Sequence, residues 1–141
     1  MEFRLARIED LKQLKIIYKE IIKNMNKNNI QIWDDIYPCE FFEDDINNKR
    51  LYVIADDEEI ISAFALCDNN AREAMYIDRL GVNVEYSKKG IGQQMLNKAK
   101  EITKSIGAEY LRLFVVDINK PAIRLYQKNG FTKVDGVYDE V

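Results

Sequence analysis

Two glycines in the middle of the chain lie where a segment typical of a strand meets one typical of a helix, and this arrangement could bind an anion. Residues 76–84 alternate and carry β-branched side chains, whereas apolar residues recur at helical spacing over residues 91–106. Gly90 and Gly92 lie at the turn between the two segments. A helix that begins directly after such a turn leaves several backbone N–H groups without partners, and its dipole adds partial positive charge there. The stretch is therefore suited to a pyrophosphate or a similar anion.

The glycine pair alone does not identify the ligand. Gly-x-Gly also occurs in ordinary strand-to-helix turns, so both interpretations stay open at this point. The dinucleotide-binding fingerprint fails because Met95 occupies the position of its third glycine, and no Walker A pattern is present. Lys88 and Lys89 would add positive charge at the rim of an anion site.

Histidine is absent from the 141 residues, which limits the possible chemistry. Ser-His-Asp and Cys-His nucleophilic sites are excluded, so any acid–base step must use carboxylates, tyrosine, lysine, cysteine or bound water. Cys39 and Cys67 are far apart and form no C-x-x-C pair. They indicate reduced thiols in a cytoplasmic protein, and without histidine no metal site is expected.

Length and composition indicate one globular domain spanning residues 1–141, with the 47% hydrophobic and 32% charged residues of an ordinary globular protein. The net charge of −3 argues against general nucleic-acid binding. No apolar run approaches membrane-spanning length, and no targeting segment is visible. We therefore expect neither a nucleic acid nor a membrane as partner, and a monomer or a homodimer.

Periodicity and turn residues predict strands alternating with helices. Strands are predicted over residues 3–7, 51–55, 60–66, 76–84, 110–116, 131–134 and 137–141. Helices are predicted over residues 11–25, 40–46 and 91–106 and between Asn119 and Gly130. Residues 56–59 are consecutive acids, which we assign to a solvated hairpin turn because they lack the spaced ligands of a calcium loop. The predicted fold class is α/β, with a mixed, mostly antiparallel central sheet of about seven strands and helices on both faces.

The segment from Ile30 to Pro38 has no clean period and contains the only tryptophan, Trp33. We assign the segment to a loop. Its aromatic residues either pack the loop onto the sheet or line the entrance for a substrate, and both interpretations stay open. Trp33 and Tyr37 are therefore the candidates for substrate binding.

The order of elements and two separated motifs resemble the GNAT superfamily, the acyl-CoA-dependent N-acyltransferases. The coenzyme motif of that superfamily, R/Q-x-x-G-x-G/A after a central strand, fits residues 87–92 except at Ser87. Its second motif, N-x-x-A-x-x-L-Y-x-K-x-G-F, is matched at every fixed position, by Asn119, Ala122, Leu125, Tyr126, Lys128, Gly130 and Phe131. The resemblance covers essentially the whole chain.

This resemblance implies acetyl-CoA as cosubstrate, bound in a cleft where the strands that end near Val82 and Val116 splay apart. The backbone of residues 80–82 would pair with the pantetheine arm like an added strand, and the amides of residues 88–93 would hold the pyrophosphate. Ser87 replaces the usual Arg or Gln, which removes one side-chain contact but leaves the backbone cradle. The implied coenzyme-binding residues are Leu80, Gly81, Val82, Ser87, Lys88, Lys89, Gly90, Ile91, Gly92, Gln93, Asn119 and Tyr126.

Acetyl transfer to an amine requires three catalytic contributions from the protein. A lysine-like amine has a pKa of about 10.4 and must lose a proton before it attacks. The developing oxyanion needs a donor, for which the Val82 amide is the candidate. The departing thiolate needs a proton, which the phenol of Tyr126 could supply, because the resemblance places this residue beside the coenzyme. The alternative is that Tyr126 is only a packed helix aromatic.

The base is harder to assign. Asp78 is the candidate, because strand alternation gives it the parity of Tyr76 and Leu80 and the resemblance implies a carboxylate or an ordered water on this strand. An Asp78–Arg79 charge pair at a strand surface is the alternative explanation, and Glu73 is a second carboxylate nearer the beginning of the strand.

Two functions follow from the resemblance. The first is an N-acetyltransferase that acts on a primary amine of a small molecule or a protein. The net negative charge favours cationic acceptors such as polyamines or lysine-bearing peptides. The second is a non-catalytic module that binds or senses acyl-CoA, which the serine at position 87 and the unassigned base would explain.

Overall fold

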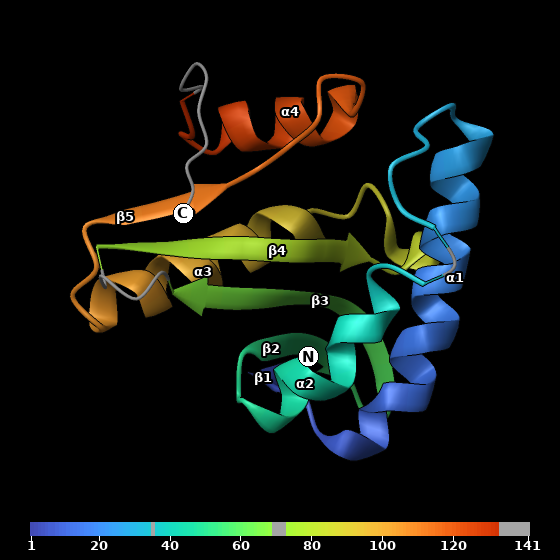
Figure 1. The fold of residues 1–141 in the computed structure, drawn as a ribbon, viewed down its shortest axis with the longest axis horizontal. Coiled ribbons are helices and arrows are strands. Elements are labelled where there is room, and N and C mark those ends of the chain that lie inside the picture. The colour runs from blue at the N-terminus through green and yellow to red at the C-terminus, as the bar shows by residue number, and fades with distance from the viewer. Residues whose placement is uncertain (35, 69–72, 133–141) are drawn as a thin grey trace.

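The structure, a computed structural model, describes residues 1–34, 36–68 and 73–132. Its helices and strands follow the order β1 (Glu2–Leu5), α1 (Leu11–Lys27), α2 (Phe42–Asn47), β2 (Leu51–Asp56), β3 (Glu59–Asp68), β4 (Ala74–Val82), α3 (Ile91–Ser105), β5 (Tyr110–Leu113) and α4 (Lys120–Lys128) (Figure 1). Short 3-10 turns lie at Ile8–Asp10, Cys39–Phe41 and Val84–Tyr86. The predicted order of elements is confirmed up to α4.

The sheet has the order β1-β2-β3-β4-β5. The first three pairs are antiparallel and the β4–β5 pair is parallel, which confirms a mixed, mostly antiparallel sheet. The described residues contain five strands instead of the predicted seven or so. Phe131 and Thr132 have no strand structure, and the rest of the predicted terminal hairpin lies outside the described residues.

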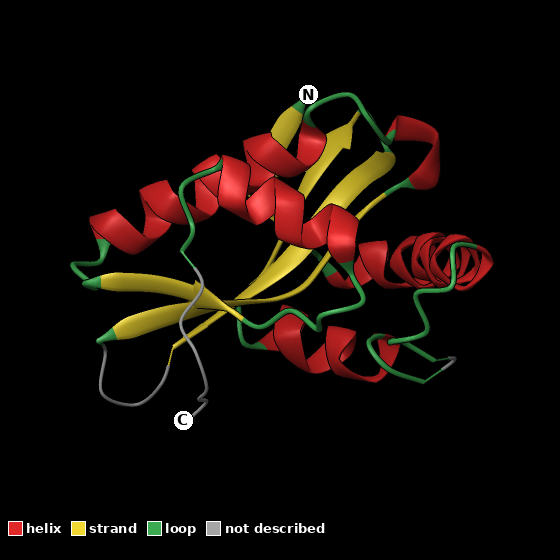
Figure 2. Ribbon diagram, turned by 90° about the horizontal axis from the view of Figure 1, so that it is seen from above, coloured by secondary structure: helices red, strands yellow, loops and turns green. Residues whose placement is uncertain are grey.

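Two hydrophobic cores lie on opposite faces of the sheet, because successive strand residues point to opposite sides. One core packs α1 and α2 against side chains such as Leu51 and Val53, and the other packs α3 against side chains such as Phe64 and Ile77. Figure 2 shows helices on both sides of the twisted sheet, as predicted. Among the described residues, no helix is long and apolar enough to cross a membrane.

The last predicted internal strand is shorter than expected. We predicted a strand to residue 116, but β5 ends at Leu113, where it pairs with Ile77 of β4. Beyond this pair the two segments of the chain diverge, as Figure 1 shows for β4 and the segment that leads from β5 up to α4. The β propensity of residues 114–116 does not make a strand here, since a strand needs a partner for its backbone groups.

An irregularity in β4 sets the geometry of the strand's end. Ala65 pairs with Asp78 and Ala63 pairs with Gly81, so β4 contains one residue more than β3 over this stretch. Arg79 lies in this bulge with a left-handed φ of 58°. The extra residue reverses the alternation, so that Leu80 joins the core on the α3 side while Gly81 faces Tyr18 and Ile21 of α1. The predicted common parity of Asp78 and Leu80 is therefore wrong.

Candidate active site

A cavity of about 640 Å³ opens where β4 and β5 part. Its walls come from the end of β4, the segment after β5, the first turn of α3, α4, the C-terminal half of α1 and the loop after α1. The lining residues are Ile21, Met25, Ile32, Trp33, Tyr37, Ile77, Asp78, Arg79, Leu80, Gly81, Val82, Gly92, Leu113, Phe114, Val115, Val116, Asn119, Ala122, Leu125 and Tyr126. The structure thus brings together most of the residues singled out from the sequence.

The edge of β4 that faces this cavity carries free hydrogen-bonding groups. Asn83 N donates to Ile61 O over 2.7 Å, on the β3 side. Because neighbouring residues of an antiparallel strand point their amides to opposite sides, the N–H of Val82 points away from β3. The β4–β5 ladder has already ended at the Ile77–Leu113 pair, so no strand of the described chain pairs with Val82 on that side. The amide is available to a ligand in the cavity.

Hydrogen bonds from α1, α2 and β3 hold the bulge in place. The buried hydroxyl of Tyr18 donates to Arg79 O over 2.6 Å, and Ser62 Oγ donates to Gly81 O over 2.6 Å. The Arg79 guanidinium donates to Asp45 Oδ2 over 2.7 Å, and Asp45 is fully buried. Gly81 has no room for a side chain, because a Cβ there would lie 2.8 Å from the ring of Tyr18.

The turn before α3 presents a row of unpaired amides. Lys88 and Gly90 both have left-handed φ angles, 64° and 77°, which turn the backbone sharply into the helix. The first helical bond runs from Gln94 N to Gly90 O over 3.1 Å. Within the described part of the chain, no acceptor is found for the amides of residues 88–93. This geometry fits an anionic group.

The side chains of this turn contribute little beyond charge. Ser87, Lys88, Lys89 and Gln93 are exposed, and Lys89 Nζ lies 5.7 Å from the centre of the Tyr86 ring. Ile91 is buried in the core on the α3 side, so only its backbone can reach a ligand.

Gly92 lies in close contact with a side chain of α4. A Cβ at this position would lie 2.9 Å from Leu125 Cδ2. The absence of a side chain therefore lets α4 approach α3, and a substitution at Gly92 disturbs this packing in addition to any effect on a bound anion.

Tyr126 and Asn119 reach the cavity from α4. Burial raises the pKa of Tyr126 to about 12, so the phenol keeps its proton throughout the neutral range. The described residues offer no hydrogen-bond partner to this phenol; its ring packs edge-on near Phe131, with the centroids 6.1 Å apart. Asn119 caps α4, since its Oδ1 accepts from Ala122 N over 3.3 Å. Capping gives Asn119 a structural role. Its position on the cavity wall also makes its side-chain amide accessible to a ligand bound there.

Asp78 lies on the cavity wall, half-buried. Burial raises its pKa, while the nearby Arg79 and a hydrogen bond from the Cys67 thiol act in the opposite direction. Burial, followed by the charge of Asp78, raises the pKa of Cys67 to about 11, which keeps the thiol protonated as a donor. The ion pair of Arg79 is with Asp45, so the proposed Asp78–Arg79 surface pair is not its main contact.

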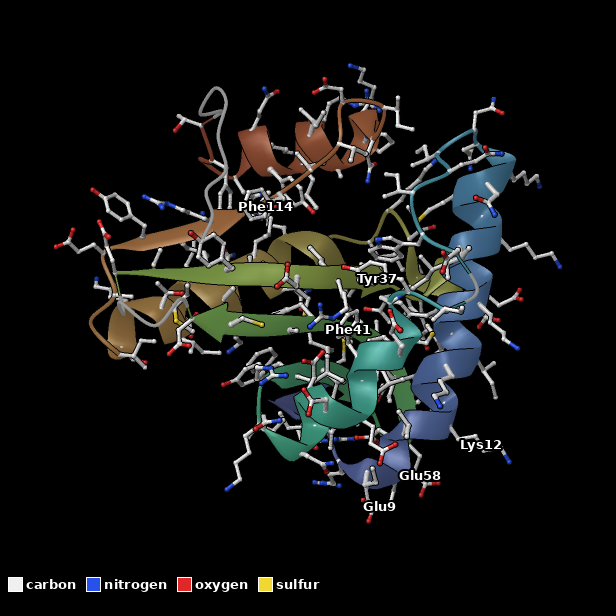
Figure 3. All side chains as sticks on the ribbon, in the orientation of Figure 1. Glu9, Lys12, Tyr37, Phe41, Glu58 and Phe114 are labelled. Carbon is white, nitrogen blue, oxygen red and sulfur yellow. The ribbon has the colours of Figure 1, made fainter. Side chains whose placement is uncertain are left out.

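Trp33 and Tyr37 both pack and line the cavity, so the two interpretations of their loop are compatible. Trp33 stacks on Tyr18 with the ring centres 5.8 Å apart, and Tyr37 meets Trp33 edge-on at 6.3 Å. In Figure 3, Tyr37 and Phe41 lie between the end of β4 and α2, whereas Phe114 lies beside β5 and α4.

Sequence reasoning missed Tyr18, Asp45, Arg79 and Phe114. Tyr18 lies in the helix predicted over residues 11–25, but the sequence predicted no role for its hydroxyl. The local sequence offered no clear signal for the two charged residues, because Asp45 directly follows Glu43 and Asp44, and Arg79 directly follows Asp78.

Comparison with known proteins agrees with this site. Residues 14–131 match the acetyltransferase (GNAT) family, so the chain belongs to this family and is an acetyltransferase. It is 25% identical to the putative phosphinothricin acetyltransferase YwnH of Bacillus subtilis, over 94% of this chain and 85% of that protein. It is 28% identical to the acetyltransferase PseH of Campylobacter jejuni, over 67% of this chain and 55% of that protein.

Among solved structures, the PaiA N-acetyltransferase from Thermoplasma acidophilum, solved in complex with coenzyme A, superimposes with a TM-score of 0.76. The two chains are 27% identical, and the match covers 96% of this chain and 92% of that one. The family assignment and the fold class made from the sequence are confirmed. The assignment of individual site residues stays a prediction.

Proposed function

We propose that this chain is a single-domain N-acetyltransferase that moves the acetyl group of acetyl-CoA to a primary amine by direct attack on the thioester. The observation that carries the proposal is that three features border one cavity: the unpaired edge of β4, the first turn of α3 at Gly92 next to the unpaired amides, and the half-buried phenol of Tyr126. A coenzyme A complex of the related PaiA protein supports the choice of cosubstrate.

The coenzyme fits the polar groups that the structure leaves unpaired. The amides of residues 88–93 suit the pyrophosphate, with Lys88 and Lys89 adding charge at the rim. The backbone of residues 80–82 suits the amide-bearing pantetheine arm, which would extend the sheet as a strand does. Asn119 offers its side-chain amide from the opposite wall.

Three groups serve the chemistry. Asp78 takes the proton that the acceptor amine loses, and its raised pKa makes it a stronger base than an exposed carboxylate. The Val82 N–H donates to the carbonyl oxygen as negative charge builds up on it. Tyr126 donates its proton to the departing thiolate, and the burial that raises its pKa ensures that the proton is present.

The test is the replacement Tyr126→Phe, read by release of free thiol from acetyl-CoA in the presence of an amine panel. General acids contribute roughly 10²–10⁴-fold. Coenzyme A is a fair leaving group, so we expect kcat and kcat/KM to fall together by about 100-fold, with the acetyl-CoA affinity unchanged.

A matched control is Tyr52→Phe, which removes the same hydroxyl from a tyrosine of β2 that stacks on Phe3 of β1, near the edge of the sheet opposite β5. Wild-type turnover in Tyr126→Phe would show that Tyr126 is not the general acid and only packs in its helix. Tight binding of acetyl-CoA by the wild-type protein without turnover of any amine would favour the module that binds or senses acyl-CoA.

A further inference from the structure

A buried ion pair joins α2 to the bulge in β4. The Arg79 guanidinium donates to Asp45 Oδ2 from two nitrogens, over 2.7 Å from Nη2 and over 3.2 Å from Nε. Asp45 is fully buried, and the side chain of Arg79 is only 8% exposed. At this burial the loss of either partner leaves a charge without compensation, so the pair is strongly favoured in the folded protein.

The helix that carries Asp45 is itself firmly anchored. α2 packs into the core through Phe42, which is fully buried and meets the ring of Tyr18 edge-on with the centres 4.7 Å apart. The other carboxylate oxygen of Asp45, Oδ1, accepts from Arg50 Nε over 3.0 Å, and Arg50 N donates to Asp45 O over 2.9 Å. The carboxylate therefore offers Arg79 a fixed point of attachment.

Arg79 is shared by the two parts of the cavity wall. Its backbone forms the bulge, and the same strand continues to Val82, whose amide is the candidate donor to the oxyanion. Its side chain faces the segment that joins α1 to α2: the guanidinium carbon lies 4.9 Å from the centre of the Phe41 ring, and the group also contacts the Tyr37 hydroxyl. Figure 3 shows Tyr37 and Phe41 next to each other in this region.

Aromatic contacts lead from the Arg79 side chain back to its own backbone. The ring of Phe41 meets that of Tyr37 edge-on at 5.5 Å, and Tyr37 meets Trp33 edge-on at 6.3 Å. Trp33 stacks on Tyr18 at 5.8 Å, and the Tyr18 hydroxyl donates to Arg79 O over 2.6 Å. Chains of packed side chains of this kind carry energetic coupling, so a change at Arg79 affects both the edge of β4 and the loop after α1.

We propose that Asp45 is a positioning residue for acetyl transfer. Through Arg79 it holds the Val82 amide toward the coenzyme, and it holds Trp33 and Tyr37 in place on the opposite part of the wall. This inference rests on the proposed function and adds a residue that touches neither substrate. If Asp45 only compensated the buried charge of Arg79, its loss would lower stability without changing ligand binding by the folded protein.

The experiment compares Asp45→Asn with Asp44→Asn. Both remove one carboxylate from α2, but the side chain of Asp44 is 69% exposed and pairs with Arg50 instead of Arg79. In calorimetry we expect the affinity for coenzyme A to fall by roughly 2–30-fold in Asp45→Asn, the range for residues that act on a ligand through others. Asp44→Asn should bind coenzyme A like the wild type.

Trp33 supplies a second readout that needs no ligand. It is the only tryptophan, so quenching of the protein's tryptophan fluorescence by acrylamide reports how closely this loop is packed. Quenching should increase in Asp45→Asn and stay unchanged in Asp44→Asn. Arg79→Lys keeps the buried charge but replaces the planar guanidinium by a single ammonium, so it should remain folded and show the same two changes to a smaller extent.

The double variant Asp45→Asn with Arg79→Met separates positioning from charge compensation. It leaves no unpaired charge at this place, so it should unfold at a higher urea concentration than Asp45→Asn alone. Because the ion pair is still missing, its affinity for coenzyme A should stay as low as in Asp45→Asn. Recovery of both stability and affinity would overturn the inference, since compensation of charge would then be the whole role of Asp45.

Wild-type affinity and quenching in folded Asp45→Asn or Arg79→Lys would overturn the inference as well. The proposed function has a separate readout, because the wild-type protein must bind coenzyme A. A wild-type protein that does not bind it refutes the proposed function, whereas acrylamide quenching still tests whether Asp45 holds the loop.

Discussion

Removing the hydroxyl of Tyr18 tests whether the hydrogen bond from α1 stabilises the bulge in β4. Tyr18 is 1% exposed, and its hydroxyl donates to Arg79 O over 2.6 Å. Tyr18→Phe keeps the ring against Gly81 but leaves the carbonyl oxygen of Arg79 without its donor. An unsatisfied buried acceptor costs about 1–3 kcal/mol, which is the expected loss in the free energy of unfolding.

The effect on ligand binding follows from the strain at Arg79. A left-handed φ in a residue other than glycine costs about 1–2 kcal/mol, which the bond from Tyr18 helps to offset. If the bulge relaxes, the register of β4 shifts by one residue and the Val82 amide turns toward β3. Coenzyme binding must then restore the bulge, so its affinity should fall by roughly 5–30-fold.

Urea denaturation and calorimetric titration with acetyl-CoA measure the two effects separately. Tyr52→Phe is the control, since it makes the same chemical change against Phe3 and Phe64 on the α3 side. A Tyr18→Phe protein that loses 1–3 kcal/mol of stability yet binds acetyl-CoA like the wild type would refute the reasoning, because the bulge would then persist without its hydroxyl bond.

Three further predictions concern Asp78 and the glycine turn. Because burial raises the folded-state pKa of Asp78, ionisation costs stability once the pH rises above its unfolded value of about 3.9, so Asp78→Asn should raise the neutral-pH unfolding free energy by on the order of 1 kcal/mol. The same variant should lose the acidic limb of the kcat/KM–pH profile together with most of the rate, and an unchanged profile would exclude Asp78 as the base. Gly90→Ala should cost about 1–2 kcal/mol in a urea titration, because φ is 77° there, whereas Gly90→Asn should cost less; equal losses would show that φ is not the cause. Gly92→Ala should weaken acetyl-CoA binding in calorimetry by displacing Leu125, and adding Leu125→Ala should recover affinity if packing between α3 and α4 is the cause. No recovery would place the bound pyrophosphate against Gly92 instead.

The parts of the fold that follow local patterns could be predicted from the sequence. The helix after Gly90 and the helix capped by Asn119 begin where glycine, proline and capping residues indicated, since these signals act within a few residues. The apolar runs of β2 and β3, separated by the acidic residues 56–59, likewise identified the strands and the hairpin between them.

The bulge could not be predicted, because the contacts that hold it are distant in sequence. Arg79 and Asp45 are 34 residues apart, and Tyr18 and Arg79 are 61 apart. Nothing in the local sequence marks Arg79 as left-handed, since glycine or asparagine is the usual signal. Strand parity was therefore extended through Leu80, and the length of β5 was overestimated because propensity says nothing about where two strands diverge.

The free edge of β4 also bears on how this protein avoids aggregation. Unpaired strand edges ordinarily invite a strand from another molecule, and natural proteins block them with charge, proline or a covering element. Here the edge lies inside the sheet, between residues 78–82 and residues 113–116, with α4 alongside. A full polypeptide strand carries side chains on both faces and meets steric barriers there. A pantetheine arm, which is unbranched over its β-alanine and cysteamine units, avoids most of them. The same recess that admits a pantetheine arm thus protects the edge from domain swapping and cross-β association.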